Sequence, residues 1–266
     1  MAGQDHCPSE TVAAPVDSSW PASGDWIGWA STWEARMQAF FPQRQVCIAA
    51  ILDVLAELLP PGPSRILDLG AGAGGLSRAI LARFPEASVT ALDLDPVLMT
   101  IGKGALTAAG SRLTWRQVDL RAPGWSDHVA DDAPFDAVVS LATLHHFTRR
   151  ELAGIYAALA RLIRPGGILI NAEGLAAGPP DSFLARRFDE ARRRGSPPAD
   201  GWWEAISADP GLTEAVAARE SLKGQMRGAG PRLSAESHLR ALRRAGFQEA
   251  VVAWRYLDEA AVVGLR

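Results

Sequence analysis

The sequence predicts an α/β fold with a doubly wound, mostly parallel sheet. Between residues 45 and 173, short apolar runs alternate with amphipathic stretches. The runs are apolar almost throughout, which is typical of strands buried on both faces. The first run is followed by a cluster of glycines, LDLGAGAGG at Leu67–Gly75. These observations favour parallel strands joined by right-handed helical crossovers.

The bulk composition narrows the class of protein. The chain has 266 residues, of which 48% are hydrophobic and 21% charged, so one large domain or a domain with a small subdomain is expected. The net charge of −3 supplies no basic field for a nucleic acid. Cys7 and Cys47 form no disulfide framework, and no apolar run is long enough to span a bilayer. We therefore expect a cytoplasmic protein without a membrane partner.

The N-terminal part predicts an arm and two helices. Residues 1–24 are rich in Pro, Ser, Gly and Ala, and we expect a flexible arm. Trp29 and Trp33 recur at helical spacing within 25–44, where a lid helix is predicted. Its aromatic stripe either packs on the body or faces a ligand, and both can hold together. A second, amphipathic helix follows over 45–59.

Seven strands are expected: Arg65–Leu69, Ser88–Leu94, Leu113–Val118, Phe135–Leu141, Ile168–Ala172, Val251–Trp254 and Ala261–Leu265. The last two are joined by a tight connection and should be antiparallel. The segment 174–231 breaks the alternation and is too long for a bare loop, so we interpret it as a helical cap insertion. Asp181 and Asp209 are expected to begin helices within it, and Ser234 to cap the helix that follows.

The glycine cluster has two interpretations. Gly70, Gly72 and Gly75 match G-x-G-x-x-G, the pattern of a loop that holds a dinucleotide pyrophosphate. Asp68, however, lies at the end of the same strand, where its carboxylate would repel that anion. A cofactor that carries a sulfonium and an ammonium group reverses this argument. The loop therefore favours a positively charged adenosyl ligand over a nicotinamide dinucleotide.

Acidic residues also follow the second and third strands. Asp93 lies at the spacing where an acid accepts hydrogen bonds from ribose hydroxyls. Asp119 is suited to the amino group of adenine, and Leu120 to one face of its ring. These residues predict a ligand that contains adenosine.

With these pieces in order, the chain resembles the class I S-adenosylmethionine-dependent methyltransferases, which implies a seven-stranded Rossmann-like sheet. The matching motifs are LDLGAGAGG, ALDLDP, QVDL, FDAVVSLATLHHF, the RPGG turn before ILINAE, and LRRAGFQEAVVAWR with AVVGLR. The resemblance covers roughly 45–173 and 232–266, which would form the cofactor-binding methyltransferase domain. The arm and the cap match nothing specific.

The resemblance implies a set of S-adenosylmethionine-binding residues at the carboxyl ends of the first four strands: Asp68, Gly70, Ala71, Gly72, Asp93, Leu94, Asp119, Leu120 and Leu141. Asp68 and the backbone of the glycine loop would hold the methionine part. Leu94 would lie against adenine, and the carbonyl near Leu141 would meet the ammonium group.

Methyl transfer from a sulfonium needs in-line geometry and shielding from water, which a lid and a cap would supply. A general base is needed only if the acceptor must lose a proton. His145 and His146 are the catalytic candidates, and at most one of them is expected to face the pocket and act. The alternative, which we favour, is local packing in the turn. Glu173 either touches substrate or is a surface carboxylate.

Four tryptophans are candidates for binding the substrate: Trp29, Trp33, Trp202 and Trp203. Trp202 and Trp203 would either stack on a flat acceptor or anchor the cap to the body. The other histidines, His6, His128 and His238, have no paired acid or metal-ligand spacing, so no metal site is predicted.

The predicted function is methyl transfer to a small aromatic or amphipathic acceptor, such as a secondary metabolite. The alternatives are methylation of tRNA or another nucleic acid, opposed by the charge, and a non-methylating protein or enzyme that has kept the fold. The acceptor atom and the oligomeric state, a homodimer included, stay open at this point.

Overall fold

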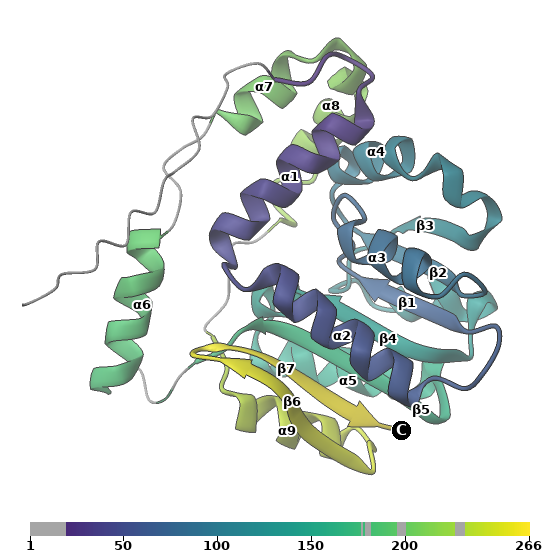
Figure 1. Cartoon of the computed structure of the whole chain (residues 1–266), viewed down its shortest axis with the longest axis vertical. Helices are drawn as coiled ribbons and strands as arrows, with labels where there is room; N and C mark the ends of the chain where they lie inside the picture. The colour runs from purple at the N-terminus through teal and green to yellow at the C-terminus, as the bar shows by residue number, and fades with distance from the viewer. Residues whose placement is uncertain (1–19, 177, 179–181, 196–200, 227–231) are drawn as a thin grey trace, which may run out of the picture.

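The computed structural model describes residues 20–176, 178, 182–195, 201–226 and 232–266. In this part of the chain, seven strands form one sheet in the order β3-β2-β1-β4-β5-β7-β6 (Figure 1). The strands are β1 (Arg65–Leu69), β2 (Ser88–Asp93), β3 (Leu113–Gln117), β4 (Phe135–Leu141), β5 (Ile163–Gly174), β6 (Glu249–Tyr256) and β7 (Glu259–Leu265). The first five are parallel, and β7 pairs antiparallel with both β5 and β6. The predicted sheet is therefore confirmed.

Strand β5 is longer than its apolar run predicts. It begins at Ile163, before the RPGG turn, and continues to Gly174. The pairing with β7 extends to Glu173↔Ala260 and Gly174↔Glu259, because backbone hydrogen bonds do not require apolar side chains. This extension holds the polar Glu173 in the sheet, next to the site described below.

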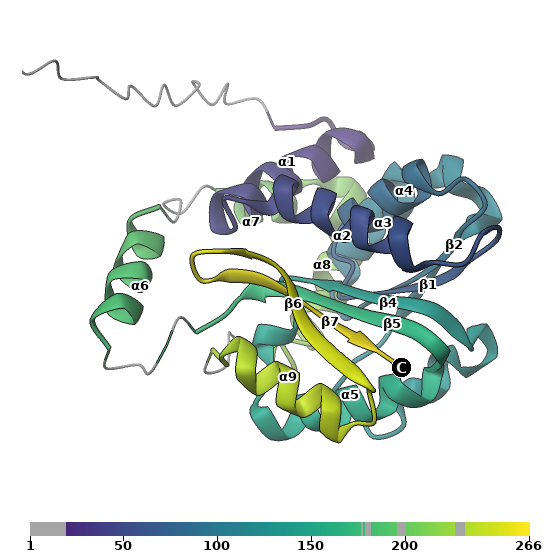
Figure 2. The same cartoon turned by 60° about the horizontal axis from the view of Figure 1, so that its bottom comes forward.

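Helices cover both faces of the sheet (Figure 2). Helices α2 (Arg44–Leu58) and α3 (Gly75–Arg83) pack on one face, while α5 (Arg149–Leu162) and α9 (Ala235–Arg244) pack on the other. Side-chain caps fix the first turn of two of these helices. Thr148 and Glu151 form a capping box at α5, and the Ser234 side chain accepts from Ser237 N at α9, as predicted.

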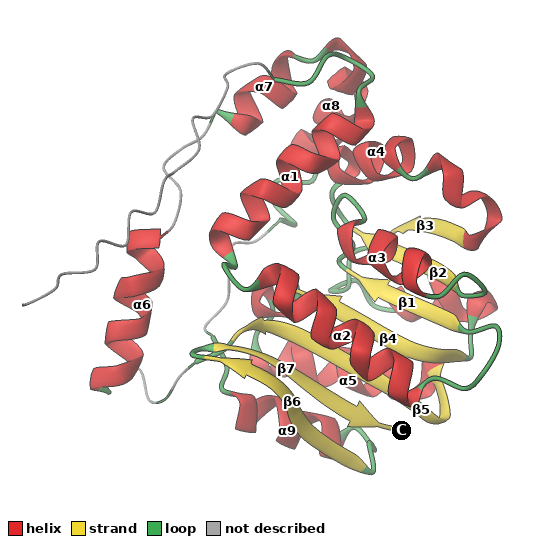
Figure 3. Ribbon diagram, in the orientation of Figure 1, coloured by secondary structure: helices red, strands yellow, loops and turns green. Residues whose placement is uncertain are grey.

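A third apolar cluster lies beyond the carboxyl edge of the sheet. It joins α4 (Pro96–Ala105) to the N-terminal helix α1 (Trp26–Phe40) and to two inserted helices, α7 (Trp202–Ala208) and α8 (Thr213–Ser221). Figure 3 shows these helices grouped together, with α6 (Phe183–Gly195) set apart from them. The short 3₁₀ helices are η1 (Thr107–Arg112), η2 (Trp125–Asp132), η3 (Leu144–His146) and η4 (Pro210–Leu212).

Two helix starts were predicted between residues 174 and 231, and the structure describes one of them. The Asp209 side chain accepts from Gly211 N at the start of η4. The predicted cap at Asp181, and the arm up to residue 19, lie outside the described residues. Among the described helices, no single one is long and apolar enough to cross a membrane; α1 and α2 pass that test only as a pair, and they are bent by 98°.

Candidate active site

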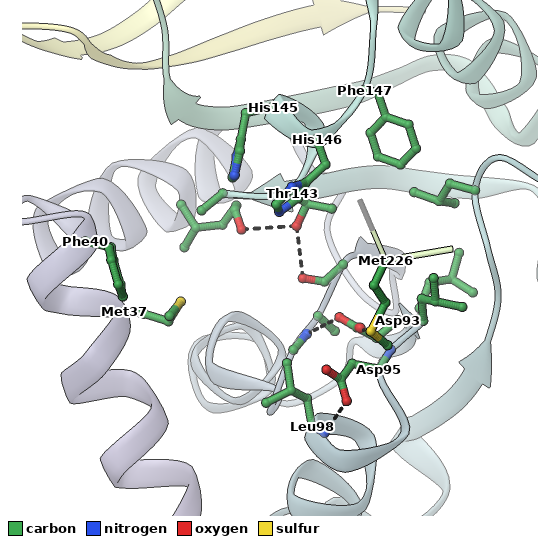
Figure 4. Close-up of a pocket in the computed structure, with 18 of the residues that line it drawn as sticks. Met37, Phe40, Asp93, Asp95, Leu98, Thr143, His145, His146, Phe147 and Met226 are labelled. Carbon is green, nitrogen blue, oxygen red and sulfur yellow. Dashed lines mark hydrogen bonds between the residues drawn. The ribbon is translucent and has the colours of Figure 1, made fainter. Parts of the chain in front are cut away.

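A cavity of about 710 Å³ lies at the carboxyl ends of β1 to β4 (Figure 4). Binding sites for small molecules usually span roughly 300–1,000 Å³, so this volume suits a nucleoside together with a second small molecule. Most of the predicted site residues line it: Trp33, Gly70, Ala71, Gly72, Asp93, Leu94, Asp119, Leu120, Leu141, His145 and His146.

The glycine loop after β1 is held in a conformation that needs glycine. Gly70 and Gly72 have φ angles of +72° and +57°. A Cβ atom at position 70 would lie 2.1 Å from Thr143 Oγ1, so the space beside Thr143 also requires glycine. The N–H groups of Gly70 and Ala71 both donate to Leu92 O at 2.8 Å. The glycine loop is thus held by contacts within the protein.

Asp93, at the end of β2, lines the cavity, and backbone N–H groups hold its carboxylate in place. Its Oδ2 accepts from Gly72 N at 2.7 Å, and its Oδ1 accepts from Asp95 N at 2.8 Å. Burial raises the pKa of Asp93 to about 6, although these N–H groups oppose the shift. Each carboxylate oxygen retains a second acceptor direction, which suits the vicinal hydroxyls of a ribose.

The far end of the cavity is closed by an inserted helix. The Asp95 side chain caps α4 by accepting from Val97 N at 2.9 Å, and it also accepts from Arg219 Nε of α8 at 2.7 Å. The Arg219 guanidinium lies 3.8 Å from the centre of the Trp203 ring. Residues far apart in the sequence therefore form one wall beside Asp93.

Asp68 does not line the cavity. Its side chain is 1% exposed and accepts from Ser77 Oγ at 2.6 Å. Burial raises the pKa of this carboxyl to about 6, while the Ser77 hydrogen bond and the Arg44 charge oppose the rise. Asp68 is thus held by a contact inside the protein, and its predicted role in cofactor binding stays a prediction.

Arg44 is a cavity residue that sequence reasoning missed. Its guanidinium lines the cavity and donates to both carboxylate oxygens of Glu34, at 2.9 and 3.1 Å. The side chain of Arg44 is only 7% exposed, so its pairing with Glu34 is shielded from water. A lone arginine before a predicted helix carries no sequence signal for this position.

Both adjacent histidines line the cavity, although adjacent residues on a turn were expected to face it only rarely. That at most one of them acts stays a prediction. They lie on η3, after β4, with ring centres 4.1 Å apart (Figure 4). The 3₁₀ turn runs along the cavity wall, so consecutive side chains both reach it. His145 differs from His146 in its partner, since its Nδ1 lies 3.5 Å from Glu173 Oε2.

Glu173 is buried. The interpretation of this residue as a surface carboxylate was therefore wrong. Its side chain is 1% exposed, and its Oε1 accepts from Asn171 Nδ2 at 2.8 Å. Burial alone would raise its pKa, but the facing His145 and His238 outweigh burial, and the pKa lies below its ordinary value. The prediction that His238 has no paired acid was wrong, because its Nε2 lies 3.5 Å from Glu173 Oε1.

The four candidate tryptophans have different positions: one lines the cavity, and the others pack against neighbouring residues of the protein. Trp33 lines the cavity, whereas Trp29 and Trp202 are each 1% exposed and lie between helices. Trp29 Nε1 donates to Asp209 Oδ2 at 2.9 Å, and Trp202 Nε1 donates to Thr32 Oγ1 at 2.9 Å. Buried indoles need such acceptors, so these two join α1 to the inserted helices. Trp203 does not line the cavity and packs on Arg219.

The remaining wall is largely apolar, although Arg121 and Arg232 also line the cavity, and it was not predicted. Side chains from α1 and its end, from the inserted segment and from the turn after β4 supply it: Met37, Phe40, Phe41, Met226, Thr143 and Phe147. Figure 4 labels Met37, Phe40, Thr143, Phe147 and Met226. The helical spacing of Trp33, Met37 and Phe40 carries a usable signal, because it continues the tryptophan stripe. No sequence pattern indicated that Met226 would line the cavity.

Comparisons with known proteins agree on one class. The methyltransferase domain family matches residues 66–167. A ubiquinone biosynthesis O-methyltransferase of Xylella fastidiosa is 36% identical over 44% of this chain and 45% of its own length. A trans-aconitate 2-methyltransferase of Streptomyces avermitilis is 38% identical over 35% of this chain and 34% of its own length.

Among solved structures, the S-adenosylmethionine-dependent methyltransferase SibL is similar with a TM-score of 0.57. It is 16% identical, and the match covers 84% of this chain and 55% of that one. This likeness concerns the fold. The match spans less than half the length of each of the two curated relatives named above.

Proposed function

We propose that this chain, which belongs to the class I S-adenosylmethionine-dependent methyltransferases, transfers a methyl group to a small aromatic or amphipathic acceptor. The cofactor, when bound, supplies a methyl group already activated by a sulfonium. The proposal is carried by one observation: a single cavity joins acidic groups suited to adenosine with an apolar wall that carries His145.

The chain's own residues fit that cofactor. Asp93 would accept hydrogen bonds from the ribose hydroxyls, and Asp119 would accept one from the adenine amino group. The backbone of Gly70–Gly72 and the Leu141 carbonyl would hold the amino-acid end of the cofactor. The fixed glycine loop supports this fit, because a side chain at Gly70 would collide with Thr143.

The acceptor would lie in the apolar half of the cavity, against Met37, Phe40 and Met226. These side chains exclude water and hold the acceptor in line with the methyl group. His145 would remove a proton from the acceptor through Nε2, since its Nδ1 faces Glu173. The ionised Glu173 carboxylate would stabilise the resulting imidazolium, as an acid does behind a catalytic histidine.

The test is turnover with a panel of acceptors. Purified protein is incubated with S-adenosylmethionine and phenols, trans-aconitate or primary amines, and the demethylated cofactor and the methylated product are measured by mass spectrometry. The His145→Ala variant should lose about 100-fold in kcat while it retains cofactor affinity. His128→Ala, outside the residues that line the cavity, is the matched control.

Two results would contradict this proposal. Transfer to RNA alone, with binding that falls steeply as salt increases, would identify a nucleic-acid methyltransferase. Cofactor binding without any demethylated product would identify a protein that uses the fold for another purpose.

A further inference from the structure

A buried polar network lies behind Glu173, on the side away from His145. Tyr156 of α5 and His238 of α9 are 0% and 2% exposed, and the Tyr156 hydroxyl lies 2.9 Å from His238 Nδ1. His238 Nε2 lies 3.5 Å from Glu173 Oε1. Asn171, 1% exposed, donates from Nδ2 to the same Oε1 at 2.8 Å. Three elements of the fold thus converge on one carboxylate.

The positions of the protons follow from this arrangement. Burial raises the pKa of Tyr156 well above its ordinary value, so the hydroxyl stays protonated and donates to His238 Nδ1. Burial also lowers the pKa of His238, against the opposing charge of Glu173. The neutral ring must then carry its proton on Nε2, which faces Glu173.

The network assigns a different task to each oxygen of the carboxylate. His238 Nε2 and Asn171 Nδ2 both approach Oε1. This leaves Oε2 directed at His145 Nδ1, at 3.5 Å. A carboxylate with two donors on one oxygen cannot rotate freely, so its second oxygen is held toward the cavity.

We propose that Tyr156 and His238 are positioning residues that act through Glu173 to orient His145 for proton removal from the methyl acceptor. This inference rests on the proposed function. It differs from ordinary core stabilisation because its effect must pass through His145.

A double-mutant cycle tests that path. Tyr156→Phe removes one hydroxyl and keeps the buried ring, and Tyr256→Phe, at a tyrosine that is 48% exposed, is the matched control. We expect Tyr156→Phe to lower kcat about 10-fold with no change in cofactor affinity, and Tyr256→Phe to change neither. In a His145→Ala background, Tyr156→Phe should cause no further loss. An equal loss in both backgrounds, or no loss with His145 present, would overturn the inference.

A second pair of variants keeps the test independent of the folding of Tyr156→Phe. His238→Gln retains an amide donor that can reach Glu173, whereas His238→Ala has none. The inference predicts that His238→Gln retains several-fold more kcat than His238→Ala. Equal kcat values for the two folded variants would overturn it.

Long-range ¹H–¹⁵N NMR of the histidine rings gives a readout without catalysis. We expect the Nε2–H tautomer for His238 and the Nδ1–H tautomer for His145 in the wild type, with mixed tautomers at both rings in Tyr156→Phe. An Nε2–H tautomer at His145 in the wild type would overturn the inference. If the wild type transfers no methyl group, the proposed function fails, and the NMR result decides the orientation of His145 by itself.

Discussion

His145 Nδ1 lies 3.5 Å from Oε2 of Glu173, and these two side chains are 25% and 1% exposed. One partner thus faces the cavity while the other is enclosed by protein. This pair connects the cavity to the core of the fold.

Replacing Glu173 with Gln should lower kcat by 10- to 100-fold, on the order of the effect of weakening a general base. The change removes the buried charge and keeps the size of the side chain. Kinetics with saturating acceptor and cofactor would measure it. Glu249→Gln, on the exposed start of β6, is the control and should leave kcat unchanged. Equal kcat for Glu173→Gln and the wild type would show that His145 acts without this carboxylate.

The same variant should change how stability depends on pH. The pKa of Glu173 is lowered in the folded protein, so its ionised form contributes stability above its ordinary pKa of 4.5. That contribution is lost as pH falls from 4.5 through the lower folded value. The difference in melting temperature between wild type and Glu173→Gln should therefore be largest at neutral pH and decrease below pH 4.5. Calorimetry over this range would contradict the idea if the difference stayed constant.

Cofactor affinity should weaken in mild acid because of Asp93. Its pKa of about 6 means that acidification protonates the group expected to accept the ribose hydroxyls. At a pH one unit below this value, about one-tenth of the carboxyl is ionised, and affinity should fall by about 10-fold relative to pH 7. Isothermal titration calorimetry would measure this. Asp93→Asn should bind more weakly and show a flatter pH dependence; unchanged affinity in this variant would remove Asp93 from the site.

Asp68→Asn should stabilise the ligand-free protein in mild base. Burial raises the pKa of Asp68 from 3.8 to about 6, so its stability contribution is present below 3.8 and is lost as pH rises through 6. At pH 8 the ionised, buried carboxylate costs about 3 kcal/mol, and the neutral amide avoids that cost. Thermal unfolding at pH 4 and pH 8 should show a gain at pH 8 only. A gain of the same size at both pH values would assign the effect to packing.

Asp209→Ala should loosen the contact between α1 and the inserted helices. It leaves the buried Trp29 Nε1 without its acceptor, which should cost about 1–3 kcal/mol in unfolding free energy. Denaturant unfolding would measure the change. Ser23→Ala removes another donor to Asp209 but leaves Trp29 paired, and should cost less. Equal losses in the two variants would show that the indole hydrogen bond contributes little.

Periodicity was sufficient to predict the sheet. The order of the motifs was sufficient to predict most of the residues that line the cavity at the ends of the first four strands. Apolar strands of five to seven residues, such as Arg65–Leu69 and Phe135–Leu141, have the bounds that their hydrophobic runs predicted. The glycine loop and Asp93 line the cavity, because the carboxyl ends of parallel strands meet at one edge whatever packs around them.

The acceptor side was not predictable in the same way. Arg44, Met226 and Arg219 reach the cavity from helices or segments outside the first four strands, and no local pattern marks them. The tryptophans show the converse: Trp29 and Trp33 lie on one helical stripe, yet only Trp33 lines the cavity, since Trp29 meets Asp209 instead. Packing between distant helices decided which face each presents.

The amino-acid sequence by itself determined the doubly wound sheet and the glycine loop at its carboxyl edge, because hydrophobic period and glycine conformation act over a few neighbouring residues. Only the tertiary structure decided that Asp68 is buried against Ser77, and that His145, Glu173 and His238 form one chain of contacts. The two contacts of Glu173 join residues 28 and 65 positions apart, and their energies depend on burial, which no short segment encodes.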